Sequence, residues 1–129
     1  IPDAKENTTW YASTETWSDA DTTAGFRIGF NNFSRSYVTD SPAEGTWNRL
    51  QSKIFINGHK IEPPKWKQAG KKGDLELPLI DEGYEYREPH QILLKKGWNK
   101  VLVKLPVGSF KTPDFGNPVK WMFTVVKED

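Results

Sequence analysis

Apolar and polar residues alternate along much of this chain, and this alternation is its strongest pattern. One run places Phe26, Ile28 and Phe30 on the same side, with polar residues or glycine between them. Similar runs occupy 98–106 and 119–127. Successive side chains of a strand point to opposite faces, so a period of two predicts half-buried β-strands. Shorter segments of the same kind lie at 8–13, 51–57, 84–88 and 90–95.

Turn-forming residues separate these segments. Asn57 and Gly58 form the dipeptide that favours a type I′ hairpin turn, since both central positions of that turn need a positive φ. This turn should join the strand before it to a short strand at 60–62. Lys96 and Gly97 predict a second hairpin, which joins the segments on either side of them.

Prolines mark where strand pairing should stop. Pro63 and Pro64 have no N–H to donate to a sheet, so they end the first hairpin. Pro106 and Pro118 bracket a loop rich in Gly, Ser, Thr and Asn. Roughly seven or eight short strands with polar loops, and almost no helical periodicity, predict an all-β fold. We expect a single domain over 1–129, built as an antiparallel β-sandwich or jelly roll.

Composition narrows the class of protein. The chain of 129 residues has 18 basic and 17 acidic side chains, and six of its residues are Trp. Its near-zero net charge argues against a nucleic-acid partner, because such proteins gather basic residues in stripes. No apolar run has the roughly 18–20 residues that a membrane span needs. Without cysteine, disulfides and thiol catalysis are excluded. Since the chain begins Ile-Pro, we expect a piece excised from a larger polypeptide.

Patterns for catalysis and metal binding are weak. His59 lies in the Asn-Gly turn and His90 opens a strand, with no metal-ligand spacing between them. No two loop carboxylates are marked as the facing pair that a glycosidase needs. Residues 19–25 resemble the start of a calcium loop, but the glycine comes one place late and no Glu closes the loop. We expect no catalytic residue, no metal ligand and no cofactor, and only a looser structural Ca²⁺ site at 19–25 stays open.

Aromatic residues near polar ones in loops remain as candidate chemistry. The apolar C–H face of a pyranose packs on Trp or Tyr, while its hydroxyl groups need donors and acceptors at the ring edge. In such a site, Trp and Tyr side chains would stack on the sugar ring, and an arginine would donate paired hydrogen bonds to its hydroxyl groups. The candidates for carbohydrate binding are Trp66, Trp47, Tyr84, Tyr86 and Arg87. The alternative for Trp47 and Trp66 is that each covers an open end of the sandwich.

The other tryptophans are assigned to structure. Trp98 and Trp121 sit inside strand patterns, and we expect both in the core. Core packing is also expected for Trp10, whereas Trp17 carries no assignment.

Two segments of the chain together resemble a known family. The first segment is 54–61, IFINGHKI, and the second, which follows later in the chain, is 92–105, ILLKKGWNKVLVKL. This pair resembles the galactose-binding-like β-sandwich modules attached to bacterial glycoside hydrolases. A wider set of segments looks like the C-terminal accessory domain of family 20 β-N-acetylhexosaminidases. These segments are 25–37, 42–66, 84–99 and 121–126.

The resemblance implies a galactose-binding-domain-like jelly roll that is periplasmic, cell-surface or secreted in a bacterium. It implies no catalysis by this chain, because the catalytic Asp-Glu pair of the family belongs to a separate barrel domain. The expected partner is carbohydrate or the parent enzyme's catalytic domain. Three functions stay open: a carbohydrate-binding accessory module, a scaffold that packs on the catalytic domain, and an independent hydrolase.

Overall fold

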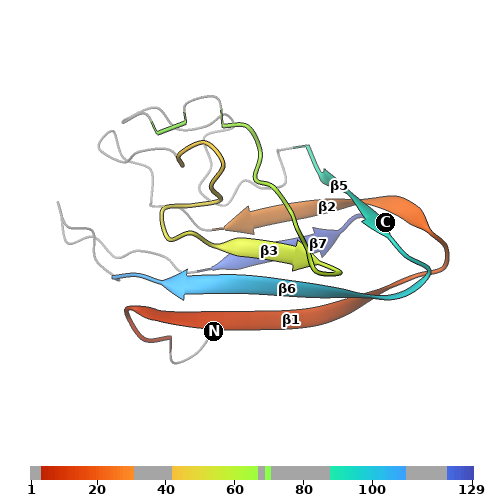
Figure 1. The fold of residues 1–129 in the computed structure, drawn as a ribbon, viewed down its shortest axis with the longest axis horizontal. Helices are drawn as coiled ribbons and strands as arrows, with labels where there is room; N and C mark the ends of the chain where they lie inside the picture. The colour runs from red at the N-terminus through yellow and green to blue at the C-terminus, as the bar shows by residue number, and fades with distance from the viewer. Residues whose placement is uncertain (1–3, 31–41, 67–68, 71–87, 110–121) are drawn as a thin grey trace.

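The computed structural model describes residues 4–30, 42–66, 69–70, 88–109 and 122–129, and this part of the chain is all-β (Figure 1). Its strands are β1 (Thr8–Ser18), β2 (Thr22–Phe30), β3 (Lys53–Ile56), β4 (His59–Lys60), β5 (His90–Leu94), β6 (Gly97–Val107) and β7 (Phe123–Lys127). The described residues contain no helix, which agrees with the missing helical periodicity of the sequence.

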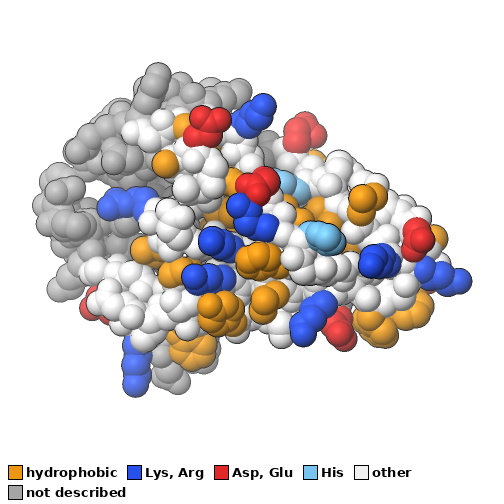
Figure 2. Space-filling view, in the orientation of Figure 1, with side chains coloured by type: hydrophobic (Ala, Val, Ile, Leu, Met, Phe, Trp, Pro, Cys, Tyr) orange, Lys and Arg blue, Asp and Glu red, His pale blue; other side chains and the backbone are white. Residues whose placement is uncertain are grey.

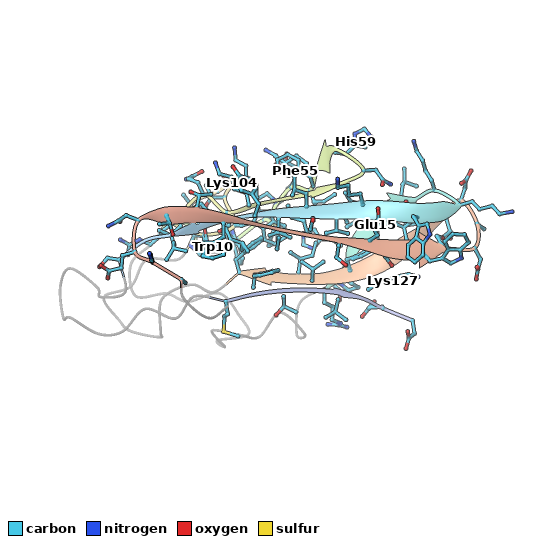
Figure 3. All side chains as sticks on the ribbon, turned by 90° about the horizontal axis from the view of Figure 1, so that it is seen from below. Trp10, Glu15, Phe55, His59, Lys104 and Lys127 are labelled. Carbon is cyan, nitrogen blue, oxygen red and sulfur yellow. The ribbon has the colours of Figure 1, made fainter. Side chains whose placement is uncertain are left out.

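The strands form two antiparallel sheets. One sheet has four strands in the order β1-β6-β3-β4, and the other has three in the order β5-β2-β7. Figure 3 shows the sheets edge-on as two layers, with β1, β6 and β3 above and β2 and β7 below. The predicted all-β class and the two-sheet antiparallel arrangement are therefore confirmed.

The core lies between the sheets and is centred on β6. Val101, Val103 and Leu105 of this strand are buried, and they belong to one cluster with Phe26 and Ile28 of β2. Each fully buried side chain of this size stabilises the fold by about 1.5–3 kcal/mol relative to leaving it in water. β6 is the central strand because it pairs with β1 along all of its length and with β3 on its other side.

The chain passes between the two sheets twice at the same end of the sandwich (Figure 1). The crossings are the β1–β2 connection around 18–22 and the β5–β6 connection around 94–98, and we call this end the tip. The backbone N–H of Lys96 donates to Asp21 Oδ1 at 2.7 Å and ties one crossing to the other. The prediction of a hairpin at Lys96 and Gly97 is wrong, because β5 pairs with β2 and β6 pairs with β1.

A buried asparagine joins the tip to the β3–β4 hairpin. Asn99 is fully buried, and its Oδ1 accepts from Asn57 Nδ2 at 2.7 Å and from the backbone N–H of Lys95 at 2.9 Å. Its Nδ2 donates to the carbonyl oxygens of Lys95 at 2.8 Å and Gly97 at 3.0 Å. The predicted Asn-Gly turn is confirmed: β3 pairs with β4, and Asn57 has a φ of 51°. The Asn-Gly and Gly-Trp-Asn segments are thus halves of one hydrogen-bonded structure.

Replacing Gly97 by alanine should lower the free energy of unfolding by about 1–2 kcal/mol, because L-residues avoid this backbone conformation. Gly97 has a φ of 101°, and a Cβ there would meet no atom within 4 Å, so the expected cost is conformational rather than steric. Urea denaturation of the two proteins measures it. Lys96→Ala at the exposed neighbouring position is the matched control and should leave the midpoint unchanged.

Some strand boundaries differ from the expected ones. β1 continues to Ser18 rather than stopping near residue 13, because every residue from Thr8 onward has a partner in β6. β6 extends through Pro106, which the sequence assigned to a loop. Residues 84–87 of the predicted strand at 84–88 and the start of the one at 119–127 lie outside the described residues, and Glu88 is not in a strand.

Candidate functional site

Trp47, a predicted sugar-stacking residue, lies in the core. Its side chain is 3% exposed, and its indole N–H donates to the carbonyl oxygen of Ile61 at 3.2 Å. Its ring packs on Phe30 with centroids 5.4 Å apart and on His90 with centroids 5.1 Å apart. No ring face is left for a sugar, so Trp47 is removed from the candidate site. Its burial agrees with the packing alternative, in which Trp47 covers an open end of the sandwich instead of contacting a ligand.

The loop before β3 turns Trp47 inward through its own hydrogen bonds. The side-chain oxygen of Asn48 accepts from the backbone N–H groups of Leu50 and Ser52, both at 3.1 Å. The amide nitrogen of Asn48 donates to Ser52 Oγ at 2.8 Å, and both side chains are buried. The loop is therefore held by internal hydrogen bonds at the edge of the core, and it does not present a binding surface.

Trp66 is half-buried and follows the Pro63–Pro64 pair. Its indole N–H donates to the carbonyl oxygen of Thr46 at 2.7 Å, which fixes the ring against the same loop. It stays a candidate, with only part of its ring in water. Tyr84, Tyr86 and Arg87 lie outside the described residues, so their role stays a prediction.

Trp98 lies on the surface rather than in the core. It was expected in the core, but it is 66% exposed. The reason is the alternation of β6: Asn99 and Val101 point inward, so Trp98 points outward with Lys100. The signal was present in the sequence, because the pattern that buries Val101 assigns Trp98 to the opposite face. The aromatic character of Trp98 outweighed that pattern in the expectation.

Trp17 and Trp98 form an exposed pair on the outer face of the four-stranded sheet. They are direct cross-strand partners in the β1–β6 ladder, and Trp17 is 48% exposed. Their ring centroids lie 5.3 Å apart with planes at 74°, an edge-to-face contact. The indole N–H of Trp17 donates to Asp19 Oδ1 at 2.7 Å. We call Trp17 and Trp98 the tryptophan pair.

Exposed charged residues lie in the two crossings at the tip, next in sequence to the tryptophan pair. Asp19 and Asp21 lie in the β1–β2 connection, and Lys95 and Lys96 lie in the β5–β6 connection. Farther along the same outer face, Figure 3 labels Phe55 and Lys104, which lie on the side away from the second sheet. Figure 2 shows this face as hydrophobic side chains interspersed with lysines. The two indoles of the pair are thus large exposed apolar groups at an end of the sandwich whose connections carry charged side chains.

Trp10 also differs from its expected place in the core. It lies opposite the buried Leu105 on the inward face of the sheet, yet it is 36% exposed. β1 is the edge strand, and Figure 1 shows it at the margin of the molecule, with β2 and β5 toward the opposite side. Trp121 lies outside the described residues.

The described part of the chain shows no cluster of metal ligands. Nowhere within it do three or more His, Cys, Asp or Glu side chains gather as ligands for an ion. In the segment that resembled a calcium loop, Asp19 and Asp21 accept hydrogen bonds from Trp17 and Lys96 instead. The described ranges also hold no helix with the length and apolar character to cross a membrane.

Comparison with protein-family models, with curated proteins and with solved structures finds no match to this chain. The family resemblance of the sequence therefore rests on the quoted segments alone.

Proposed function

We propose that this chain is a non-catalytic accessory module of a secreted bacterial carbohydrate-active enzyme, of the β-hexosaminidase type. Its activity in this proposal is carbohydrate binding through exposed aromatic side chains. The resemblance of the Asn-Gly and Gly-Trp-Asn segments to galactose-binding-like modules supports the class of module. A jelly-roll topology and a periplasmic, cell-surface or secreted location belong to the same proposal.

The observation that carries the binding proposal is the exposure of two neighbouring indoles beside the carboxylate of Asp19, which accepts the indole N–H of Trp17. Trp17 and Trp98 keep 48% and 66% of their surfaces in water. Exposed Trp side chains in contact with each other form an apolar surface that a ligand can cover, which is favourable because it removes the rings from water. The hydroxyl groups at the edge of a sugar ring can donate hydrogen bonds to a neighbouring carboxylate.

Binding of the 129-residue chain to a glycan array, followed by titration with the best ligand, tests this function. The array should include oligosaccharides of N-acetylglucosamine, galactose, glucose and mannose. We expect specific binding with a dissociation constant at or below the millimolar range, about −4 kcal/mol at 1 mM. Absence of binding to every glycan at millimolar concentration would contradict the proposal. Turnover of an aryl-glycoside by the chain would favour the independent hydrolase instead.

A second candidate function is a scaffold that packs on the parent enzyme's catalytic domain, and β1 favours it. Trp10 and Tyr11 point to opposite faces of this strand and are 36% and 62% exposed. Within the described residues, only β6 pairs with β1, and a long edge strand of this kind is suited to contact another chain segment.

Deleting this module from the parent enzyme distinguishes the two functions. If the module is a scaffold, the melting temperature of the remaining enzyme should fall by several degrees while its affinity for carbohydrate stays the same. If the module binds carbohydrate, the affinity for a polymeric substrate should fall and hydrolysis of a small aryl-glycoside should stay unchanged. Thermal denaturation and binding to the polymer are the measurements.

A further inference from the structure

We infer that the tryptophan pair, together with Asp19, is a subsite for a single pyranose residue of a soluble glycan. The inference rests on the proposed carbohydrate binding and names the place and size of the site. That place differs from the loop site around Trp66 that the sequence predicts. Four observations carry it: ring geometry, carboxylate position, rigidity and the charge at the tip.

The geometry of the rings favours one sugar residue over an extended flat surface. The two indole planes are inclined by 74° and their centroids are 5.3 Å apart. A flat polysaccharide surface needs coplanar aromatic rings, and this pair does not supply them. An inclined pair suits a single pyranose, whose apolar face covers one indole while its edge meets the other. The ligand class is therefore a soluble oligosaccharide rather than a crystalline polymer.

Asp19 supplies the polar contact that stacking alone lacks. Its Oδ1 accepts the indole N–H of Trp17 at 2.7 Å, so the carboxylate is held at the edge of that ring. A carboxylate has two oxygens and about four acceptor sites. The side chain is exposed, and its remaining acceptor capacity can serve hydroxyl groups of a stacked sugar. Hydrogen bonds to an ionised acceptor are about twice as strong as neutral ones, and they favour ligands rich in hydroxyl groups.

The framework beneath the pair is rigid, which lowers the entropic cost of binding. Trp98 stands between Gly97 and Asn99, and the buried side chain of Asn99 makes four hydrogen bonds to Asn57, Lys95 and Gly97. Trp17 is held by its cross-strand partner and by Asp19. Neither ring is carried by a free loop, although both lie next to the two crossings of the chain at the tip.

The charges at the tip favour a small ligand over a protein partner. Asp19, Asp21, Lys95 and Lys96 are exposed and lie in the two crossings that adjoin Trp17 and Trp98 in the sequence. A stable protein interface buries about 800 Å² on each side, and its centre is depleted of charged residues. A partner that covered this tip would have to desolvate these four charges. A sugar covers the rings and leaves the charges at its edge in water or in hydrogen bonds with its hydroxyl groups.

The test compares single alanine variants in titrations with the strongest glycan from the array. Trp98→Ala and Trp17→Ala should each weaken binding at least about tenfold, which corresponds to about 1.4 kcal/mol. Asp19→Asn keeps an acceptor for the indole N–H and removes the charge, and it should weaken binding several-fold. Far-UV circular dichroism confirms that each variant is folded.

Tyr11→Ala is the matched control. Tyr11 is an exposed aromatic residue on the same strand and the same face as Trp17. The two residues are six positions apart, which is about 20 Å along a strand. One pyranose cannot reach both residues, so the Tyr11→Ala control should bind the glycan as tightly as the unsubstituted chain does. A loss of binding in Tyr11→Ala equal to that in Trp98→Ala would overturn the single-sugar site in favour of an extended surface.

The indole N–H resonance of Trp17 gives a second readout. It can be assigned from a Trp17→Phe variant, and sugar binding should shift it because the sugar contacts both the ring and Asp19. If the parent chain binds a glycan while Trp17→Ala and Trp98→Ala bind it within twofold, this inference fails and the proposed function stands. If the parent chain binds no glycan at millimolar concentration, the proposed function itself fails. If Trp66→Ala alone abolishes binding, the site is the loop that the sequence predicted.

Discussion

Replacing Trp47 by alanine should lower the free energy of unfolding by about 3–5 kcal/mol, the cost of emptying a buried aromatic site. The indole fills the space between Phe30 and His90, and its N–H is satisfied by Ile61. Alanine leaves a cavity there and an unpaired carbonyl oxygen at Ile61. Urea denaturation followed by circular dichroism measures the loss, which is large against the 5–15 kcal/mol total stability of a typical domain.

Trp98→Ala is the control for this prediction, because it deletes the same side chain at an exposed position. Its cost should be about 1 kcal/mol or less, since the side chain is mostly in water and its ring contact is with Trp17. A Trp98→Ala variant that is destabilised as much as Trp47→Ala would show that Trp98 belongs to a core. A Trp47→Ala variant with unchanged stability would return Trp47 to the list of ligand contacts.

Asn99→Ala should lower the free energy of unfolding by about 2–4 kcal/mol, because it leaves several buried polar groups without partners. Asn99 is fully buried and makes four hydrogen bonds, three of them to the backbone of the β5–β6 connection. The alanine variant has no donor for the carbonyl oxygens of Lys95 and Gly97 and no acceptor for the N–H of Lys95. The same denaturation experiment measures this loss.

Asn57→Gly is the matched control for Asn99→Ala. Glycine accepts the φ of 51° at this position, so the turn is kept while the side-chain bonds to Asn99 and to the N–H of Lys100 are lost. Its cost should be smaller, about 1–2 kcal/mol. The double variant should lose less than the sum of the two single variants, because the Asn57–Asn99 bond is shared. Strict additivity would contradict a coupled network.

These variants also separate stability from binding. Asn99 follows Trp98 in β6, so the two side chains point to opposite faces of the sheet: Asn99 faces inward and Trp98 faces outward. Asn99→Ala should therefore reduce stability, whereas Trp98→Ala should reduce glycan binding with little effect on stability. The Gly-Trp-Asn segment, which was expected to serve the fold alone, then holds both a structural residue and a ligand-contacting residue.

The local pattern of the chain was sufficient to predict β2, β6 and the first hairpin. Alternation located β2 and β6, because a strand with one buried face needs an apolar residue at every second position. The Asn57–Gly58 dipeptide located the β3–β4 turn, because few residues accept a positive φ. The same alternation also determined that Trp98 faces outward. It was misjudged because aromatic residues were assigned to the core by type rather than by their place in the strand.

Only the tertiary structure decided how the strands are distributed between the sheets and which tryptophans are covered. Gly97 marks a turn, but a turn residue does not determine whether the chain continues in the same sheet or crosses to the other. Here it crosses, since β5 pairs with β2. Trp47 is buried because Phe30, Ile61 and His90 meet around it from three distant segments. Trp17 meets Trp98 because the β1–β6 register brings together residues far apart in the sequence. Burial and pairing of this kind depend on long-range contacts, which no local pattern contains.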